Sequence, residues 1–306
     1  MKKAKIVSLG AIITIAGVLI AGNCVAAAYA PMITTFLAGT GVNFDSDEFT
    51  EAAAKSDELA QRIAEEGIVM LKNNDSVLPL ATKKVNVFGW AATDQGFLLS
   101  GIGSGSSTIS DSKKVTFLQA LRDDGFEYNQ QLIDMYNAYD STDYGYNSSR
   151  MKLIEPDQSY YNNALIENAR DFSDTAVVVL SRIAGENVGS EIPTYQTKSH
   201  GQTTDNSRTY LEISTEEEAL LDTVKENFAK VVVIVNSTNP MQLGFVNDYR
   251  IQACLDVGIP GQSGTLAIGR ILDGTVNPSG HLTDTYAYDL TQEPSFSNYL
   301  RNGNNI

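Results

Sequence analysis

One carboxylate, Glu186, stands where a working acid could be placed. It follows the apolar run from Thr175 to Leu180 after a short segment, Ser-Arg-Ile-Ala-Gly. An apolar run with almost no alternation is typical of a strand that is buried on both faces of a parallel sheet. Open α/β sheets bind ligands at the carboxyl ends of their strands. The residues alone leave two interpretations of Glu186 open, a working acid and a solvated loop charge.

Other chemistries find little support in the sequence. Gly101-Ile-Gly103-Ser-Gly105 lacks the third glycine of a dinucleotide-binding fingerprint and does not directly follow a strand. Its spacing is also wrong for the nucleophile of a serine hydrolase. The histidines, His200 and His281, and the cysteines, Cys24 and Cys254, are too few for a zinc site. We therefore expect neither a metal nor a cofactor.

The pattern along the chain alternates between buried-type strands and helices. Strands are predicted at 85–88, 175–180, 231–235 and 253–257, and helices at 45–66, 115–122, 160–172, 214–228 and 262–272. This alternation predicts an α/β fold, with a mostly parallel sheet and helices on both faces. The stretches 140–158 and 187–210 show little pattern, and we interpret them as surface loops.

The N-terminus is typical of an exported protein. Lysines precede the uncharged apolar run 6–30, which is long enough to span the hydrocarbon core of a membrane. Two interpretations remain open: a signal peptide cleaved after Ala30, or an uncleaved transmembrane anchor, favoured because Pro31 would directly follow the cut. By the positive-inside rule, the rest of the chain is expected at the extracellular face of the cell membrane, or secreted.

Composition restricts the kinds of partner. The chain has 306 residues with 42% hydrophobic and 19% charged residues, which is typical of a globular protein. Its formal net charge is −15. Nucleic acids are recognised by lysines and arginines that neutralise phosphates, so a nucleic-acid partner is not expected.

Several motifs occur in an order that resembles one enzyme family. They are Glu66-Gly-Ile-Val-Met-Leu-Lys-Asn73 with Leu78-Pro-Leu80, Gly101 to Gly105, Ser181-Arg-Ile-Ala-Gly-Glu186, Gly258-Ile-Pro-Gly-Gln262, and Asp273-Gly-Thr-Val-Asn-Pro-Ser-Gly280 with Asp284-Thr285. Together they resemble the α/β-sandwich domain of the glycoside hydrolases of family 3. The resemblance covers about residues 50–290.

The resemblance implies a β-glucosidase-like enzyme that hydrolyses O-glycosyl bonds with retention. Its substrate would be a β-linked oligosaccharide or glycoside. Glu186 occupies the position of the acid/base, while Gly103, Ser104 and Arg182 occupy substrate-binding positions. The Asp nucleophile of such enzymes lies on a (β/α)₈ barrel that is normally in the same polypeptide, about 5–5.5 Å from the acid/base in the assembled site.

The order of the parts resembles a permuted subgroup, in which the sandwich precedes the barrel. The implied organisation is a membrane anchor or signal peptide (1–30), a connector (31–47), the sandwich domain (48–290) and a truncated linker (291–306). The chain is thus interpreted as the front part of such an enzyme.

Two alternatives remain. The family segment often reads S-G-E-G-x-D, and Gly189 stands here in place of the Asp, so that Glu191 or Asp205 could serve as the acid/base. The second alternative concerns function: a catalytically inactive sugar-binding or scaffold domain on the cell surface.

Overall fold

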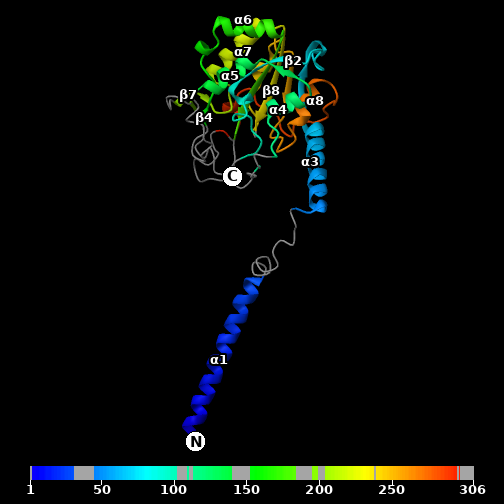
Figure 1. The fold of residues 1–306 in the computed structure, drawn as a ribbon. Helices are drawn as coiled ribbons and strands as arrows, with labels where there is room; N and C mark the ends of the chain where they lie inside the picture. The colour runs from blue at the N-terminus through cyan, green and yellow to red at the C-terminus, as the bar shows by residue number, and fades with distance from the viewer. Residues whose placement is uncertain are drawn as a thin grey trace. The chain divides into compact units, whose positions relative to one another are not determined.

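The computed structural model (Figure 1) describes most of the chain. The described residues are 2–30, 45–101, 109, 113–139, 152–183, 195–198, 204–237, 239–294 and 296. The chain divides into two compact units, Met1–Ser56 and Asp57–Ile306.

The first unit contains one long helix, α1 (Lys2–Ala28), where the sequence predicts a helical anchor or signal peptide. A membrane-spanning helix needs about 20 predominantly apolar residues. Among the residues that the structure describes, no helix combines the length and apolarity needed to cross a membrane. The predicted transmembrane role of residues 6–30 is therefore not supported, and the predicted location of the protein stays a prediction.

The second unit is built around a six-stranded sheet. In spatial order its strands are β1 (Val69–Asn73), β9 (Ala253–Asp256), β8 (Lys230–Ser237), β5 (Thr175–Arg182), β2 (Lys84–Phe88) and β3 (Glu127–Tyr128). Only β1 runs antiparallel to its neighbour, and the other pairs are parallel. The predicted α/β class with a mostly parallel sheet is confirmed.

Strands β5 and β8 form the centre of this sheet. Their register runs without a shift from Thr175 opposite Lys230 to Arg182 opposite Ser237. All apolar side chains of the two strands are buried, so neither strand shows a polar face. This explains why both are visible in the sequence as uninterrupted apolar runs.

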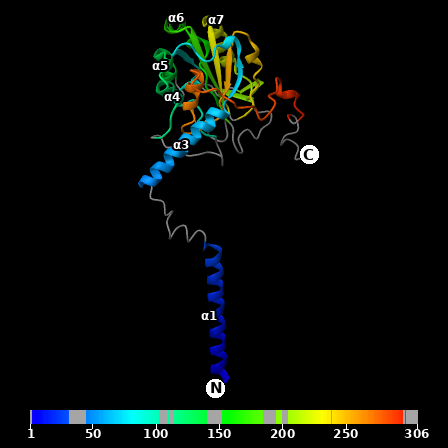
Figure 2. The same cartoon turned by 90° about the vertical axis from the view of Figure 1, so that its right-hand side faces the viewer.

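Helices cover both faces of the sheet, as predicted (Figure 2). One face packs against α4 (Phe117–Asp123) and α8 (Leu266–Leu272). The other face packs against α5 (Gln130–Ala138), α6 (Asn163–Phe172) and α7 (Thr215–Asn227). The C-terminal end of α3 (Asp47–Gly67) joins the first of these layers through Ala64.

Local chemistry explains where the helices begin. The predicted capping box is present at α7, where Ser214 accepts a hydrogen bond from the Glu217 N–H and the Glu217 carboxylate accepts one from Ser214 N–H. Side chains of Thr116, Asn129 and Asn162 cap α4, α5 and α6 in the same way. Single 3₁₀ turns lie at Asn74–Ser76, Trp90–Ala92, Gln158–Tyr160, Gly244–Asn247 and Leu290–Gln292.

The interpretation of 140–158 and 187–210 as surface loops is wrong in part. A second, three-stranded sheet is built from β4 (Lys152–Leu153), β6 (Tyr195–Lys198) and β7 (Thr204–Thr209). These strands are short and polar, so they lack the apolar alternation by which strands are recognised in a sequence. Helix α5, which is nine residues long, is a further element that the sequence analysis does not predict.

The contact between α4 and α8 contains a poorly solvated carboxyl group. Asp124 is the C-cap residue of α4, and its Oδ2 is buried without a hydrogen-bond partner in the described structure. A Cβ atom placed on Gly269 of α8 would lie 2.2 Å from this oxygen, so the helices approach closely here. Burial, and then the nearby charge of Asp273, raise the pKa of Asp124 to about 6 against the attraction of Lys83.

We expect the substitution Asp124→Asn to stabilise the domain at pH 7. A carboxyl whose pKa is raised on folding binds its proton more tightly in the folded state. Its stabilising contribution is therefore complete below about pH 4 and is lost as the pH rises through 6. The amide keeps the shape without the charge, so Tm at pH 7 should rise by roughly 1–3 °C, with little change at pH 4.

Thermal unfolding followed by circular dichroism measures this difference. The matched control is Asp123→Asn, at the exposed neighbouring position of the same helix, and it should leave Tm nearly unchanged at both pH values. A loss of Tm at pH 7 in the Asp124 variant would show that the ionised carboxylate stabilises the contact.

Candidate functional site

The carboxyl ends of β2, β5, β8 and β9 meet at one edge of the sheet, and several buried polar groups lie there. Asn236, near the end of β8, is fully buried. Its side chain accepts a hydrogen bond from Leu98 N–H (2.6 Å) and donates to the carbonyl oxygens of Leu98 (3.1 Å) and Gly258 (2.7 Å). One amide thus ties the loop after β2 to the loop after β9.

Arg182, the last residue of β5, forms a buried ion pair with Glu217 in the first turn of α7. Nη1 and Nη2 donate to the two carboxylate oxygens over 2.7 and 2.6 Å. The side chain of Arg182 is fully buried, and that of Glu217 is 8% exposed. Parallel donation to both oxygens is the strongest geometry for an arginine and a carboxylate.

All five N–H donors of Arg182 have protein acceptors. Nε donates to the Tyr210 carbonyl (2.6 Å), and the remaining Nη donors reach the carbonyl oxygens of Ser181 (2.8 Å) and Glu212 (2.5 Å). A contact with a sugar, which the resemblance implies for Arg182, would require one of these bonds to be exchanged. The observed geometry gives Arg182 a positioning role, in which it fixes the end of β5 against α7.

The sequence did not reveal a second polar cluster at this edge. Glu155 Oε2 accepts a hydrogen bond from Trp90 N–H (2.8 Å), and its Oε1 accepts one from the Tyr161 hydroxyl. That hydroxyl also bonds Tyr136 Oη (2.8 Å), which in turn accepts Gly89 N–H (2.7 Å). Glu155 lies in the stretch 140–158, whose sequence shows little pattern, so nothing in the sequence identifies it as a site residue.

Glu155 borders a small cavity beside the ends of β2 and β5. The cavity is also lined by Trp90, Ser181, Tyr210 and Glu217. Burial raises the pKa of Glu155 to about 8, although the hydrogen bonds from Tyr161 and Trp90 favour the ionised form. At neutral pH this carboxyl group therefore holds a proton, as a general acid must.

Most residues that the sequence assigned to the site lie outside the described part of the chain. These are Glu186, Gly103 and Ser104, and also the alternative acid Glu191. Asp205, the other alternative, is described in β7, where its Oδ1 accepts hydrogen bonds from the backbone N–H (2.9 Å) and hydroxyl (2.5 Å) of Ser207. The assignments of Glu186, Gly103 and Ser104 stay predictions.

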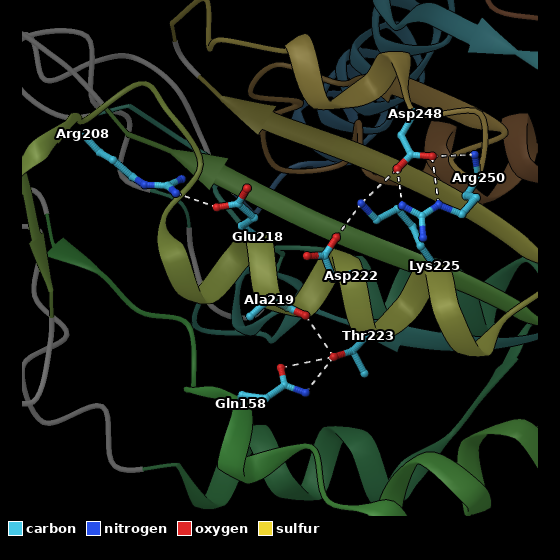
Figure 3. A network of polar contacts seen from close by, with 9 residues as sticks. All are labelled: Gln158, Arg208, Glu218, Ala219, Asp222, Thr223, Lys225, Asp248 and Arg250. Atoms are coloured by element: carbon cyan, nitrogen blue, oxygen red, sulfur yellow. Dashed lines mark hydrogen bonds and ion pairs between the residues drawn. The ribbon is translucent and has the colours of Figure 1, made fainter.

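Polar contacts along α7 hold the helix that carries Glu217 (Figure 3). Lys225 bonds Asp222 (2.7 Å) and Asp248 (3.1 Å), and Thr223 bonds Gln158 (2.8 Å). Further towards its N-terminus, Glu218 pairs with Arg208 (2.5 Å), but with side-chain exposures of 50% and 26%. Two neighbouring glutamates of one helix thus form arginine pairs in very different surroundings.

Comparison with known proteins gives a consistent result. The family model described as "Glycosyl hydrolase family 3 C-terminal domain" matches residues 68–305. The beta-glucosidase of Ruminococcus albus is 31% identical over 262 residues, which cover 84% of this chain and 25% of that protein. Beta-glucosidase A of Butyrivibrio fibrisolvens is 29% identical over 269 residues, covering 82% and 31%.

Solved structures show the same likeness. A beta-glucosidase from Paenibacillus barengoltzii superposes with a TM-score of 0.65 and 28% identity, covering 79% of this chain and 25% of that one. Beta-glucosidase 3B from Thermotoga neapolitana, solved with α-D-glucose, superposes with a TM-score of 0.64 and 25% identity, covering 80% of this chain and 32% of that one. The chain thus spans a quarter to a third of the length of these relatives.

The two arginine pairs on α7 predict very different effects on stability. Glu217→Gln removes the counter-charge of a buried guanidinium, so the free energy of unfolding should fall by about 3–5 kcal/mol. Glu218→Gln breaks an exposed pair and should change it by less than about 1 kcal/mol. Urea unfolding of both variants beside the parent measures the difference. Equal, small losses in both would show that Arg182 does not depend on Glu217.

Proposed function

Because the chain belongs to glycosyl hydrolase family 3 through the C-terminal domain of that family, we propose that it supplies the acid/base to the hydrolysis of β-glucosides. Glu186 is the proposed group. The observation that carries this proposal is the fixed end of β5: Arg182 is held by five hydrogen bonds, four residues before Glu186 in the chain. Relatives that match over most of the chain are named beta-glucosidases.

In the proposed reaction Glu186 acts twice. It first donates its proton to the glycosidic oxygen, while an Asp attacks the anomeric carbon, so that the bond to the leaving group breaks as a bond to the Asp forms. Glu186, now ionised, then takes a proton from water, which displaces the Asp and releases the sugar with its configuration retained. The Asp would come from a (β/α)₈ barrel, because the Ser-Asp-Trp setting of the family nucleophile does not occur in this sequence, whose one tryptophan follows Gly89.

An acid/base residue must be held in a fixed position by the domain that carries it. A proton donor that is misplaced by about 1 Å can cost two orders of magnitude in rate, so its loop must leave the scaffold from a fixed point. Arg182 fixes the end of β5 in this way, and Asn236 fixes the adjoining loops. Both residues lie at the edge where open α/β sheets bind their ligands.

A second candidate is a sugar-binding or scaffold domain without catalysis of its own. The same missing Ser-Asp-Trp motif favours it, because a single carboxylate cannot perform both steps of the reaction. The two candidates differ in one measurable respect. Only the first predicts turnover that depends on Glu186 when a barrel domain is present.

The decisive substitution is Glu186→Gln, assayed with a barrel-containing fragment of a family member added. Proton donation contributes about 10²–10⁴-fold, so hydrolysis of an alkyl β-glucoside, whose leaving group needs the proton, should fall by that factor. A nitrophenyl β-glucoside, whose leaving group is stable as an anion, should lose much less in the step that releases it. Without the barrel fragment, the chain should turn over neither substrate.

The matched control is Glu191→Gln, which changes another carboxylate close by in the sequence. It should leave both rates unchanged. If Glu191→Gln abolished turnover of the alkyl glucoside while Glu186→Gln did not, the assignment would move to Glu191. Turnover by the chain alone would refute the proposal that the nucleophile lies elsewhere.

A further inference from the structure

We propose that Glu155 is a positioning residue whose carboxyl group closes a ring of hydrogen bonds around the Gly89–Trp90 turn and holds one wall of the site in a proton-dependent way. The turn directly follows β2, at the carboxyl edge of the sheet. Trp90 and Glu155 both line the cavity beside the end of β5. The inference concerns this wall, and its consequence for catalysis rests on the proposed function.

The hydrogen bonds form a closed ring whose two arms both donate towards Glu155. Gly89 N–H donates to Tyr136 Oη and the Tyr161 hydroxyl donates to Glu155, while Trp90 N–H donates to the other carboxylate oxygen. Because the Tyr161 proton is used, the Tyr136 hydroxyl must donate to Tyr161 in this arrangement. The ring is closed by the backbone between Gly89 and Trp90, whose N–H groups are the donors at either side, so the ring fixes the orientation of this backbone.

A proton on Glu155 changes the ring. The ionised carboxylate accepts both of its hydrogen bonds, so the ring is fully bonded. A protonated carboxyl donates instead, and Tyr161 can accept that proton only if its own hydroxyl turns towards Tyr136. The Tyr136 hydroxyl then loses its acceptor within the ring. The two protonation states of Glu155 therefore hold the turn with different sets of bonds.

The surroundings decide which state is present. Burial is the largest influence on the pKa of Glu155 and raises it to about 8, with Glu217 and Glu216 of α7 adding to the rise. Arg182 donates to both oxygens of Glu217, and no cation is among the largest influences on the pKa of Glu155. The pKa of both phenols is raised well above 10 by burial, so Tyr136 and Tyr161 stay protonated throughout the range in which Glu155 titrates.

Trp90 is a built-in probe, because it is the only tryptophan of the chain. We expect its fluorescence to follow a single titration with a midpoint near pH 8 when the chain is brought from pH 6 to pH 10, as a negative charge appears beside the cavity it lines. In Glu155→Gln, an amide that cannot ionise, this titration should disappear.

A second variant tests the ring itself. Tyr161→Phe removes the hydroxyl that favours the ionised carboxylate, so the midpoint should move upward by roughly one pH unit. The matched control is Glu127→Gln, an exposed carboxylate on β3, which should titrate like the parent. Tyr161→Phe also keeps the proposal testable if Glu155→Gln does not fold.

Three results would overturn the inference. The Trp90 fluorescence of the parent chain could show no transition between pH 6 and 10, or the transition could persist in Glu155→Gln. The midpoint of the transition could also stay unchanged or fall in Tyr161→Phe. None of these measurements involves hydrolysis. A failure of the ring therefore leaves the assignment of Glu186 untouched. Conversely, if Glu186→Gln does not slow hydrolysis, the pH dependence of Trp90 fluorescence is still expected as described.

Discussion

The pairing of β5 with β8 is the constraint on which the rest of this domain depends. Eight consecutive residue pairs run in one register through the middle of the sheet, and both strands are buried on both faces. Since a slip of one residue would turn every side chain to the opposite layer, the register is strongly specified. It delivers Arg182 and Ser237 side by side to one edge. The apolar interior thus determines where the polar edge begins.

The polar groups at this edge are costly in isolation. A guanidinium and a carboxylate lose several kcal/mol of hydration each on burial, and a hydrophobic pair of the same size would often be at least as stable. The Arg182–Glu217 pair is therefore better explained by position than by stability. It joins a strand end, a helix N-terminus and the Tyr210–Glu212 segment at one point. Asn236 joins two further loops in the same manner without a charge.

What the sequence could predict follows from the range of the interactions. Strands β5 and β8 were predicted because burial on both faces leaves an apolar run, and the start of α7 because Ser214 and Glu217 are three residues apart. The small sheet of β4, β6 and β7 is not predicted, because its strands are short and polar and lack the apolar alternation that marks a strand in a sequence. The role of Arg182 depends on Glu217, which is 35 residues away in the chain. The hydrogen-bonded ring around Glu155 likewise depends on Tyr136 and Gly89, which lie in other parts of the chain. No local pattern encodes such contacts.

The surroundings of Glu155 and Glu217 show how one small region can keep two carboxyl groups in different states. Both line the same cavity, yet only Glu217 has an arginine against its oxygens. Glu155 receives hydrogen bonds from neutral donors, and these do not overcome its burial. At neutral pH Glu155 therefore holds a proton, while the neighbouring Glu217 forms an ion pair with Arg182.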